Sequence, residues 1–232
     1  MARTLLLFDI DGTLLKTAGA GMRAMNRVAR ELFGDTFHWE GISAGGRLDP
    51  HIFADALQLN GLPDHLDHHE TFHRRYIPAL AAELDAVADR VEILPGMHEL
   101  IASMRRRSDV VVGMVTGNYA AAAPLKLRAA GYDPTWFQVG AFGDEADDRP
   151  GLVALAIRRY HERFGSAVEP DDVIVIGDTP HDVDCALVNG CRVLAVATGS
   201  ATHRQLEEAG ATVVVDDLSD PAPLLQMIGP AA

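Results

Sequence analysis

Short apolar runs alternate with amphipathic segments along most of this chain. Five runs have the length and the Val, Ile and Leu content of buried parallel strands, at 4–10, 109–116, 172–178, 192–198 and 212–215. Between the later runs, apolar residues recur at helical spacing over 118–132, 151–165 and 179–190. Strands that alternate with helices in this way predict right-handed crossovers. We therefore expect an α/β fold, with an open, mostly parallel sheet and helices on both of its faces.

The segment between the first two runs is too long for a simple crossover. Residues 11–108 separate them, whereas a crossover needs only about a dozen residues. Within this segment, 19–34, 49–63 and 64–88 have helical spacing, and no strand is expected between them. The pattern predicts a small all-helical subdomain over 16–90, inserted into a core of 1–15 and 91–232. The helix expected over 95–107 returns the chain to that core.

The composition suits one or two globular domains, since 48% of the 232 residues are hydrophobic and 23% are charged. The apolar runs fall far short of the ~20 residues that a membrane-spanning helix needs. Asp9 and Asp11 also stand where a signal peptide would remain apolar. Cys185 and Cys191 are too few for a disulfide framework. We predict a cytoplasmic protein that does not bind membranes.

The net charge argues against a nucleic-acid partner. The chain has 20 Lys and Arg against 33 Asp and Glu, a formal charge of -13, which would repel a phosphate backbone. The one dense basic run, 105–107, is expected to be a solvated helix end. Whether the protein is a monomer or a homodimer stays open.

Polar residues stand where three of the predicted strands end. They are Asp9 and Asp11 at the end of the first, Thr116, Gly117 and Asn118 at the end of the second, and Gly177, Asp178 and Thr179 at the end of the run 172–178, with Asp182 at the start of the next helix. In open parallel sheets, ligands bind beyond the carboxyl ends of the strands. We expect these acids to lie close together.

Such an acidic cluster predicts a bound cation. Two carboxylates about 4 Å apart repel each other by roughly 1 to 4 kcal/mol, depending on the dielectric. Hard oxygen ligands with open positions favour Mg²⁺. The alternative is that Asp9 and Asp11 merely end a strand or cap a turn. This alternative is disfavoured because Thr116 and 177–182 stand at the ends of other predicted strands, where a shared site would need them.

Three motifs carry a family resemblance. The sequences DIDGT (9–13), VTGN (115–118) and GDTPHD (177–182) resemble the first, second and fourth motifs of the haloacid dehalogenase superfamily. The predicted helical insertion resembles the cap of its phosphoglycolate phosphatase-like members. The resemblance covers the whole chain, and it implies a Rossmann-like core.

This resemblance implies a role for each acid. Asp9 would attack phosphorus and form an aspartyl-phosphate, and Asp11 would protonate the leaving alkoxide and then take a proton from water. Mg²⁺ would be held by the Asp9 carboxylate, the Asp11 backbone carbonyl and Asp178. Asp182 would be a further ligand or a support of the site.

The phosphoryl group would be bound by the Thr116 hydroxyl and by the turns at Gly12, Gly117 and Asn118. The third family motif is a Lys or Arg, and here the sequence departs from the pattern. Many relatives have Lys-Pro where this chain has Arg149-Pro150, so Arg149 is the matching cation. Lys126 is its competitor, although we expect it about two turns into a helix, where it would be solvated.

The helical insertion contains one further candidate. Two glycines stand beside Arg47 in SAGGRLDPHIF (43–53), and this loop resembles the cap loop that faces substrate. The Arg47 guanidinium would pair with a carboxylate or a second anionic group of the substrate. The alternative is a surface loop in which Arg47 pairs with Asp49.

The leading functional hypothesis is a Mg²⁺-dependent phosphatase that acts on a small anionic phosphorylated metabolite such as phosphoglycolate. A phosphomutase is an alternative that these motifs do not separate. A 2-haloacid dehalogenase is disfavoured, because those enzymes lack an acid at the Asp11 position and need no metal. A non-catalytic regulatory protein is disfavoured because it would keep a costly charge cluster without use. The physiological substrate cannot be read from the sequence.

Overall fold

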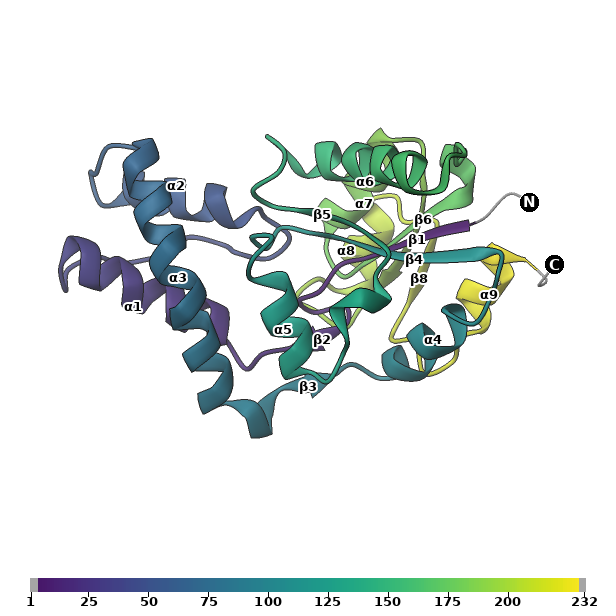
Figure 1. Cartoon of the computed structure of the whole chain (residues 1–232), viewed down its shortest axis with the longest axis horizontal. Helices are drawn as coiled ribbons and strands as arrows, with labels where there is room; N and C mark the ends of the chain where they lie inside the picture. The colour runs from purple at the N-terminus through teal and green to yellow at the C-terminus, as the bar shows by residue number, and fades with distance from the viewer. Residues whose placement is uncertain (1–3, 230–232) are drawn as a thin grey trace.

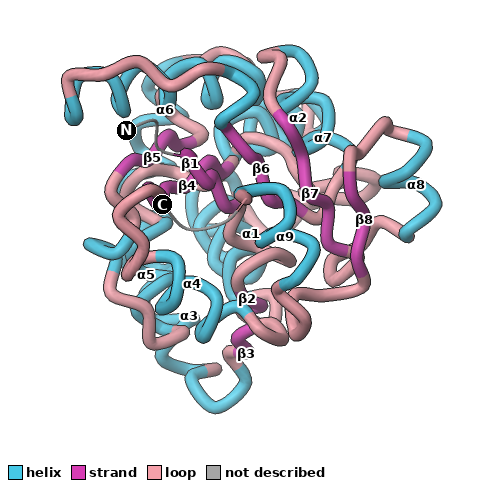
Figure 2. The backbone as a smooth tube through the Cα atoms, turned by 90° about the vertical axis from the view of Figure 1, so that its right-hand side faces the viewer, coloured by secondary structure: helices cyan, strands magenta, loops and turns pink. Residues whose placement is uncertain are grey.

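The computed structural model describes residues 4–229, and its centre is a six-stranded sheet in which all neighbouring strands are parallel. In spatial order the strands are β5 (Val139–Phe142), β4 (Val110–Thr116), β1 (Thr4–Phe8), β6 (Val173–Gly177), β7 (Arg192–Val196) and β8 (Val213–Val215). Figure 2 shows them in this order between helices. The expected α/β fold with a parallel sheet is confirmed.

Side chains of β1 alternate between two cores, as the pleat of a strand requires. Leu6 and Phe8 pack on one face against α4 (Met97–Met104), α5 (Ala123–Ala129) and α9 (Ala222–Ile228). Leu5 and Leu7 pack on the other face against α6 (Arg149–Phe164), α7 (Pro180–Val188) and α8 (His203–Glu208). Because both faces are covered, the strands need unbroken apolar sequences.

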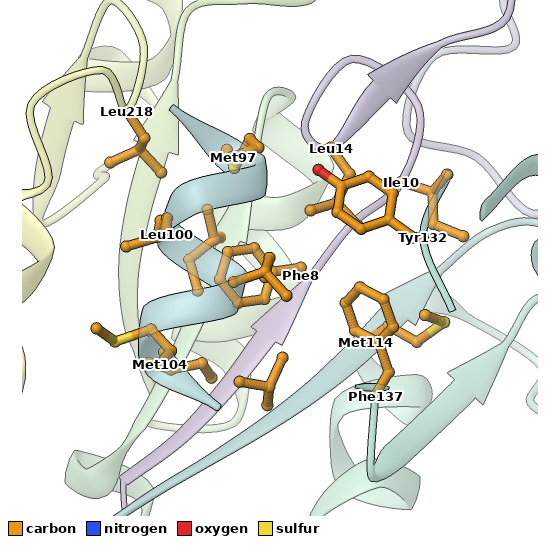
Figure 3. Close-up of a cluster of buried hydrophobic side chains, with 14 of the residues drawn as sticks. Phe8, Ile10, Leu14, Met97, Leu100, Met104, Met114, Tyr132, Phe137 and Leu218 are labelled. Atoms are coloured by element: carbon orange, nitrogen blue, oxygen red, sulfur yellow. The ribbon is translucent and has the colours of Figure 1, made fainter. Parts of the chain in front are cut away.

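The first of these cores is built around Phe8. Figure 3 shows its ring beside Leu100 and Met104 of α4, with Met114 of β4 nearby. These side chains are at most 3% exposed. This packing fixes the middle of the sheet, so the strand ends that follow Phe8 and Thr116 are held rigidly.

The insertion after β1 consists of three helices, α1 (Ala20–Phe33), α2 (Asp49–Leu59) and α3 (Leu66–Ala86). They lie to one side of the sheet (Figure 1) and share a separate cluster of buried residues that includes Met25, Phe53 and Phe72. The chain enters the insertion through β2 (Leu15–Lys16) and leaves it through β3 (Glu92–Ile93), and these two short strands pair in an antiparallel ladder. The helical cap is therefore observed, and we propose that the core and the cap divide near 15/16 and 90/91.

Several short elements were not predicted, namely β2, β3, β5, α8 and α9. They contain two to seven residues each, too few for a pattern to stand out. The helix expected over 118–132 also begins later, at Ala123, with Pro124 in its first turn. Within 4–229, none of the helices combines the length and apolar character needed to cross a bilayer.

Candidate active site

Three carboxylates from two parts of the chain meet beyond the carboxyl end of the sheet. Asp9 follows β1 and Asp178 follows β6, and Phe8 and Ile176 are register partners in these neighbouring strands. Oxygens of Asp9, Asp178 and Asp182 all lie within 4.8 Å of one another, and all three residues are buried. The parallel register thus brings together acids that are about 170 residues apart in the sequence.

The electrostatics of this cluster fit a divalent cation. Burial, together with the neighbouring carboxylates, raises the pKa of Asp9 and of Asp178 above the usual range, although Arg149 acts in the opposite direction on both. The donor atoms are hard carboxylate oxygens, as Mg²⁺ prefers. Asp9 and Asp178 are therefore suited to holding such an ion.

Asp182 is engaged by the chain on both of its oxygens. Oδ2 accepts the Thr179 backbone N–H at 3.0 Å and the Thr179 hydroxyl at 2.7 Å, which closes a capping box at the start of α7. Oδ1 accepts a hydrogen bond from Arg149. Of its two predicted roles, these contacts favour support of the site over direct metal ligation.

Arg149 begins α6 and is buried between two of the acids. Its Nη2 lies 3.1 Å from Asp9 Oδ1 and also bonds Asp182. Its Nη1 donates to the Gly46 carbonyl in the cap at 2.9 Å. Despite burial, Asp182 and Asp9 raise the pKa of Arg149 further above its usual value, so the guanidinium remains charged.

Lys126 reaches the other catalytic candidate, Asp11. Its Nζ donates to Asp11 Oδ2 at 2.6 Å and also bonds Asn118 Oδ1, while Asn118 Nδ2 donates to the same Asp11 oxygen at 2.7 Å. Lys126 is 5% exposed, so the expectation that it is solvated is wrong. The reason is the late start of α5 at Ala123, which puts Lys126 in the first turn, beside the strand end. Arg149 and Lys126 thus lie in one site, Arg149 on Asp9 and Asp182 and Lys126 on Asp11.

Two glycines allow the close approach of these segments. Gly12 has a φ of 83°, and a Cβ there would lie 2.5 Å from Asp178 Oδ2. A Cβ on Gly117 would collide with the Arg47 carbonyl oxygen. Thr116, which precedes Gly117, is fully buried and accepts the Asn118 amide at 2.7 Å. These two glycines therefore let the backbone lie directly against Asp178 and against the cap loop.

The cap loop contacts the site, and Arg47 of this loop lines its cavity. Arg47 pairs with Asp55 at 2.5 Å, so its expected alternative partner Asp49 is wrong. Asp49 instead is buried at the start of α2, where it accepts the Tyr119 N–H at 3.0 Å. Its own N–H donates to the Gly117 carbonyl at 2.7 Å.

Burial raises the pKa of Asp49 to about 7, although Lys126 opposes the shift. The sequence analysis considered Asp49 only as a partner of Arg47. Its position just before Pro50, at a helix start that follows a glycine-rich loop, is the signal that pointed to a buried role.

One cavity of about 400 Å³ joins all of these groups. Its core half is lined by Asp9, Asp11, Thr116, Asn118, Lys126, Arg149 and Asp178, with Gly12 and Gly117, and Arg47 lines it from the cap loop. Its cap half is lined mainly by Met22, Met25, Ile52 and Tyr76. A volume of this size is typical of sites for small molecules.

We expect the metal-free protein to lose stability as the pH rises from about 5 to about 8. The folded state raises the pKa of Asp9, Asp49 and Asp178, so it binds more protons than the unfolded chain in this range. For Asp49 alone, the loss over this range is on the order of 3 kcal/mol. Mg²⁺ should raise the melting temperature more at about pH 8 than at about pH 5, because its ligands are then ionised. Melting curves with and without MgCl₂ test this, and an equal Mg²⁺ effect at both pH values would contradict it.

Comparisons with known proteins agree with this geometry. A profile of the haloacid dehalogenase-like hydrolase family matches residues 6–187. The phosphoglycolate phosphatase of Nitrosospira multiformis is 26% identical over 230 residues, which cover 95% of this chain and 95% of that protein. Phosphoglycolate phosphatase 1 of Pseudomonas aeruginosa is 24% identical over 229 residues, covering 94% of this chain and 78% of that protein.

A solved structure has the same fold. CbbY from Rhodobacter sphaeroides, crystallised in complex with phosphate, matches with a TM-score of 0.75 and 22% identity, covering 94% of this chain and 96% of that chain. The family profile spans most of the sequence and includes all three motifs and both cations. The chain therefore belongs to the haloacid dehalogenase-like hydrolase family.

Proposed function

We propose that this enzyme is a Mg²⁺-dependent phosphatase that hydrolyses a small organic phosphomonoester, of about the size of phosphoglycolate, through an aspartyl-phosphate at Asp9. The observation that carries the proposal is the meeting of Asp9, Asp178 and Asp182 within 4.8 Å, with Arg149 on one side and the Asp11–Lys126 pair on the other. The relatives named phosphoglycolate phosphatase support the substrate class.

In the first step, an Asp9 oxygen attacks phosphorus and the bond from phosphorus to the leaving oxygen breaks. Asp11 gives its proton to that leaving oxygen. Mg²⁺, held by Asp9, Asp178 and the Asp11 carbonyl, would screen the charge on the transferred group. The Thr116 hydroxyl and the N–H groups of the Gly12 and Gly117 turns would bind the phosphoryl oxygens.

In the second step, Asp11 takes a proton from a water molecule, which attacks phosphorus and releases phosphate from Asp9. Arg149 stays beside Asp9 throughout, so it offsets the negative charge that gathers on the nucleophile and the phosphoryl group. Lys126 and Asn118 both hold the same Asp11 oxygen. This leaves the other oxygen of Asp11 for proton transfer.

Replacing Lys126 by Ala should lower kcat by about 10- to 100-fold, because Asp11 loses its charged partner and its fixed position. KM should change less than kcat, since the phosphoryl-binding groups stay in place. Steady-state kinetics measure both constants. Arg128 lies on the exposed face of the same helix, and Arg128→Ala is the matched control. Equal effects of the two variants would remove Lys126 from the proposed mechanism.

The proposed function is tested by phosphate release from p-nitrophenyl phosphate and from a panel of small phosphate esters, with Mg²⁺ and with EDTA. We expect turnover with Mg²⁺ and its loss in EDTA. Undiminished turnover in EDTA would contradict the metal dependence.

The same assays separate the alternatives. A phosphomutase would return the phosphoryl group to a sugar phosphate and release little free phosphate. A 2-haloacid dehalogenase would release halide from 2-chloropropionate without Mg²⁺. A non-catalytic protein would bind Mg²⁺ and turn over none of the panel.

A further inference from the structure

The cap half of the cavity contains a polar group that the proposed mechanism does not use. Tyr76 of α3 is fully buried and lines the cavity. Among residues 4–229, no hydrogen bond is made by its hydroxyl. Buried tyrosines ordinarily find a partner for this group. Burial, with Asp49 and Asp11 nearby, raises the pKa of Tyr76 well above its usual value, so the hydroxyl keeps its proton and can donate.

Lys126 faces the same point of the cavity from the core side. A Cβ built on Gly21, in the first turn of α1, would lie 3.6 Å from the Tyr76 hydroxyl oxygen and 3.7 Å from Lys126 Nζ. Gly21, Tyr76 and Lys126 all line the cavity, and Gly21 has no side chain to fill the position that lies within 4 Å of both polar atoms. Since Lys126 also holds Asp11, this space adjoins the place where the leaving oxygen departs.

Asp49 determines which chemical groups can bind in the part of the cavity between Tyr76, Lys126 and Gly21. Asp49 lines the same cavity, and its charge raises the pKa of both Tyr76 and Lys126. A hydroxyl group can accept from Lys126 or Tyr76 and donate to Asp49. A carboxylate cannot donate, and it would be repelled by Asp49. This part of the cavity therefore favours a neutral donor and acceptor over a second anion.

The other cationic side chains of the site are already paired, so they contribute little positive charge to bind a substrate carboxylate. Arg149 is bound to Asp9 and Asp182, and Arg47 is paired with Asp55 at 2.5 Å. Met22, Met25 and Ile52 make the neighbouring wall apolar. This wall suits a short carbon chain rather than a charged group.

We propose that Tyr76, Lys126 and Asp49, around the open position at Gly21, form a subsite for a hydroxyl group on the leaving alcohol of the substrate. The inference rests on the proposed phosphatase function and, among small phosphomonoesters, replaces the carboxylate of phosphoglycolate by a hydroxyl group. The preferred ester carries a hydroxyl group a few carbons from the phosphate, as in a small polyol phosphate, rather than a carboxylate.

Three esters with two-carbon leaving groups test this subsite: 2-hydroxyethyl phosphate, ethyl phosphate and phosphoglycolate. At about pH 8, where Asp49 with its pKa of about 7 is mostly ionised, we expect kcat/KM for the hydroxyethyl ester to exceed both others by about 10-fold or more. Three-carbon analogues of each type extend the comparison. Equal values for ethyl and hydroxyethyl esters would overturn the proposal. A preference for phosphoglycolate would also overturn it and would assign the carboxylate to Arg47.

Two variants locate the effect. Tyr76→Phe removes only the hydroxyl and should reduce the hydroxyethyl preference several-fold through KM. Gly21→Ala adds one methyl group at ordinary contact distance and without backbone strain, so it should fold normally and abolish the preference. Tyr132, whose buried hydroxyl has no hydrogen-bond partner among the described residues, lies in the core beneath the sheet, and Tyr132→Phe is the control. A preference unchanged in both Tyr76→Phe and Gly21→Ala would refute the assignment of these residues.

A binding measurement separates the failure of this inference from the failure of the proposed function. The Asp9→Asn protein is titrated calorimetrically with the same three esters. Tighter binding of 2-hydroxyethyl phosphate by about 10-fold supports the subsite even if no ester is hydrolysed. Equal affinities overturn the subsite even if every ester is hydrolysed.

Discussion

Asp9→Asn should lower kcat by at least about 10⁴-fold, the largest effect that we expect of any single substitution in this protein. The amide is nearly the same size as the carboxylate but is a far weaker nucleophile toward phosphorus. It also removes one ligand from the acid cluster of Asp9, Asp178 and Asp182. Phosphate release under saturating substrate, measured over long incubations, gives the residual rate.

The loss should not come from misfolding. Asn at this position removes a buried carboxylate whose pKa is raised by burial and by its acidic neighbours, so repulsion inside the metal-free protein falls. We expect a melting temperature at least equal to that of the wild type at about pH 8. Asp67→Asn, on the exposed surface of α3, is a matched control with full activity expected. Residual turnover above a hundredth of the wild-type rate would contradict the role of Asp9 as the nucleophile.

Asp178→Asn should have the second largest effect, a loss of about 10³-fold in kcat together with the loss of Mg²⁺ binding. Asp178 is a buried acid that follows β6, and its Oδ1 accepts only the Thr13 hydroxyl, at 3.0 Å, among the described residues. The amide can keep that hydrogen bond through its own oxygen, but it provides no charge for the cation. Kinetics and calorimetric Mg²⁺ titration measure the two losses.

The stability of this variant should move in the opposite direction to its activity. Because burial and two neighbouring carboxylates raise the pKa of Asp178, its ionised form destabilises the metal-free fold at about pH 8. Asp178→Asn should therefore melt at a higher temperature than the metal-free wild type, and Mg²⁺ should not stabilise it. Asp184→Asn, on the exposed face of α7, controls for a general charge effect. A variant that still gains stability from Mg²⁺ would show that the ion binds elsewhere.

The catalytic half of the site was accessible to sequence analysis because it lies at strand ends. Asp9, Thr116 and Asp178 each follow a long apolar run, and parallel pairing brings such positions together whatever their separation in the chain. The placement of Lys126 was not predicted, because the pattern extended its helix back to 118. Pro124 marks the true start, since proline is favoured in the first turn of a helix.

The cap half of the site was harder to predict from the sequence. Asp49 and Tyr76 belong to helices whose spacing predicts burial but gives no information on which core residues they meet. Their contacts with Tyr119 and with the Lys126 region depend on how the cap packs on the core, which local patterns do not encode. The short strand β5 was missed for a related reason, since its Gly140 interrupts an already brief apolar run.

The most direct test of the mechanism is chemical trapping of the phosphorylated enzyme. The protein is mixed with Mg²⁺ and substrate, quenched in acid during turnover, and reduced with borohydride, which converts an aspartyl-phosphate to homoserine. Peptide mass spectrometry should then find homoserine at position 9 only in samples that contained both substrate and Mg²⁺. An unmodified Asp9 in an enzyme that turns over, or modification at another carboxylate, would contradict covalent catalysis by Asp9.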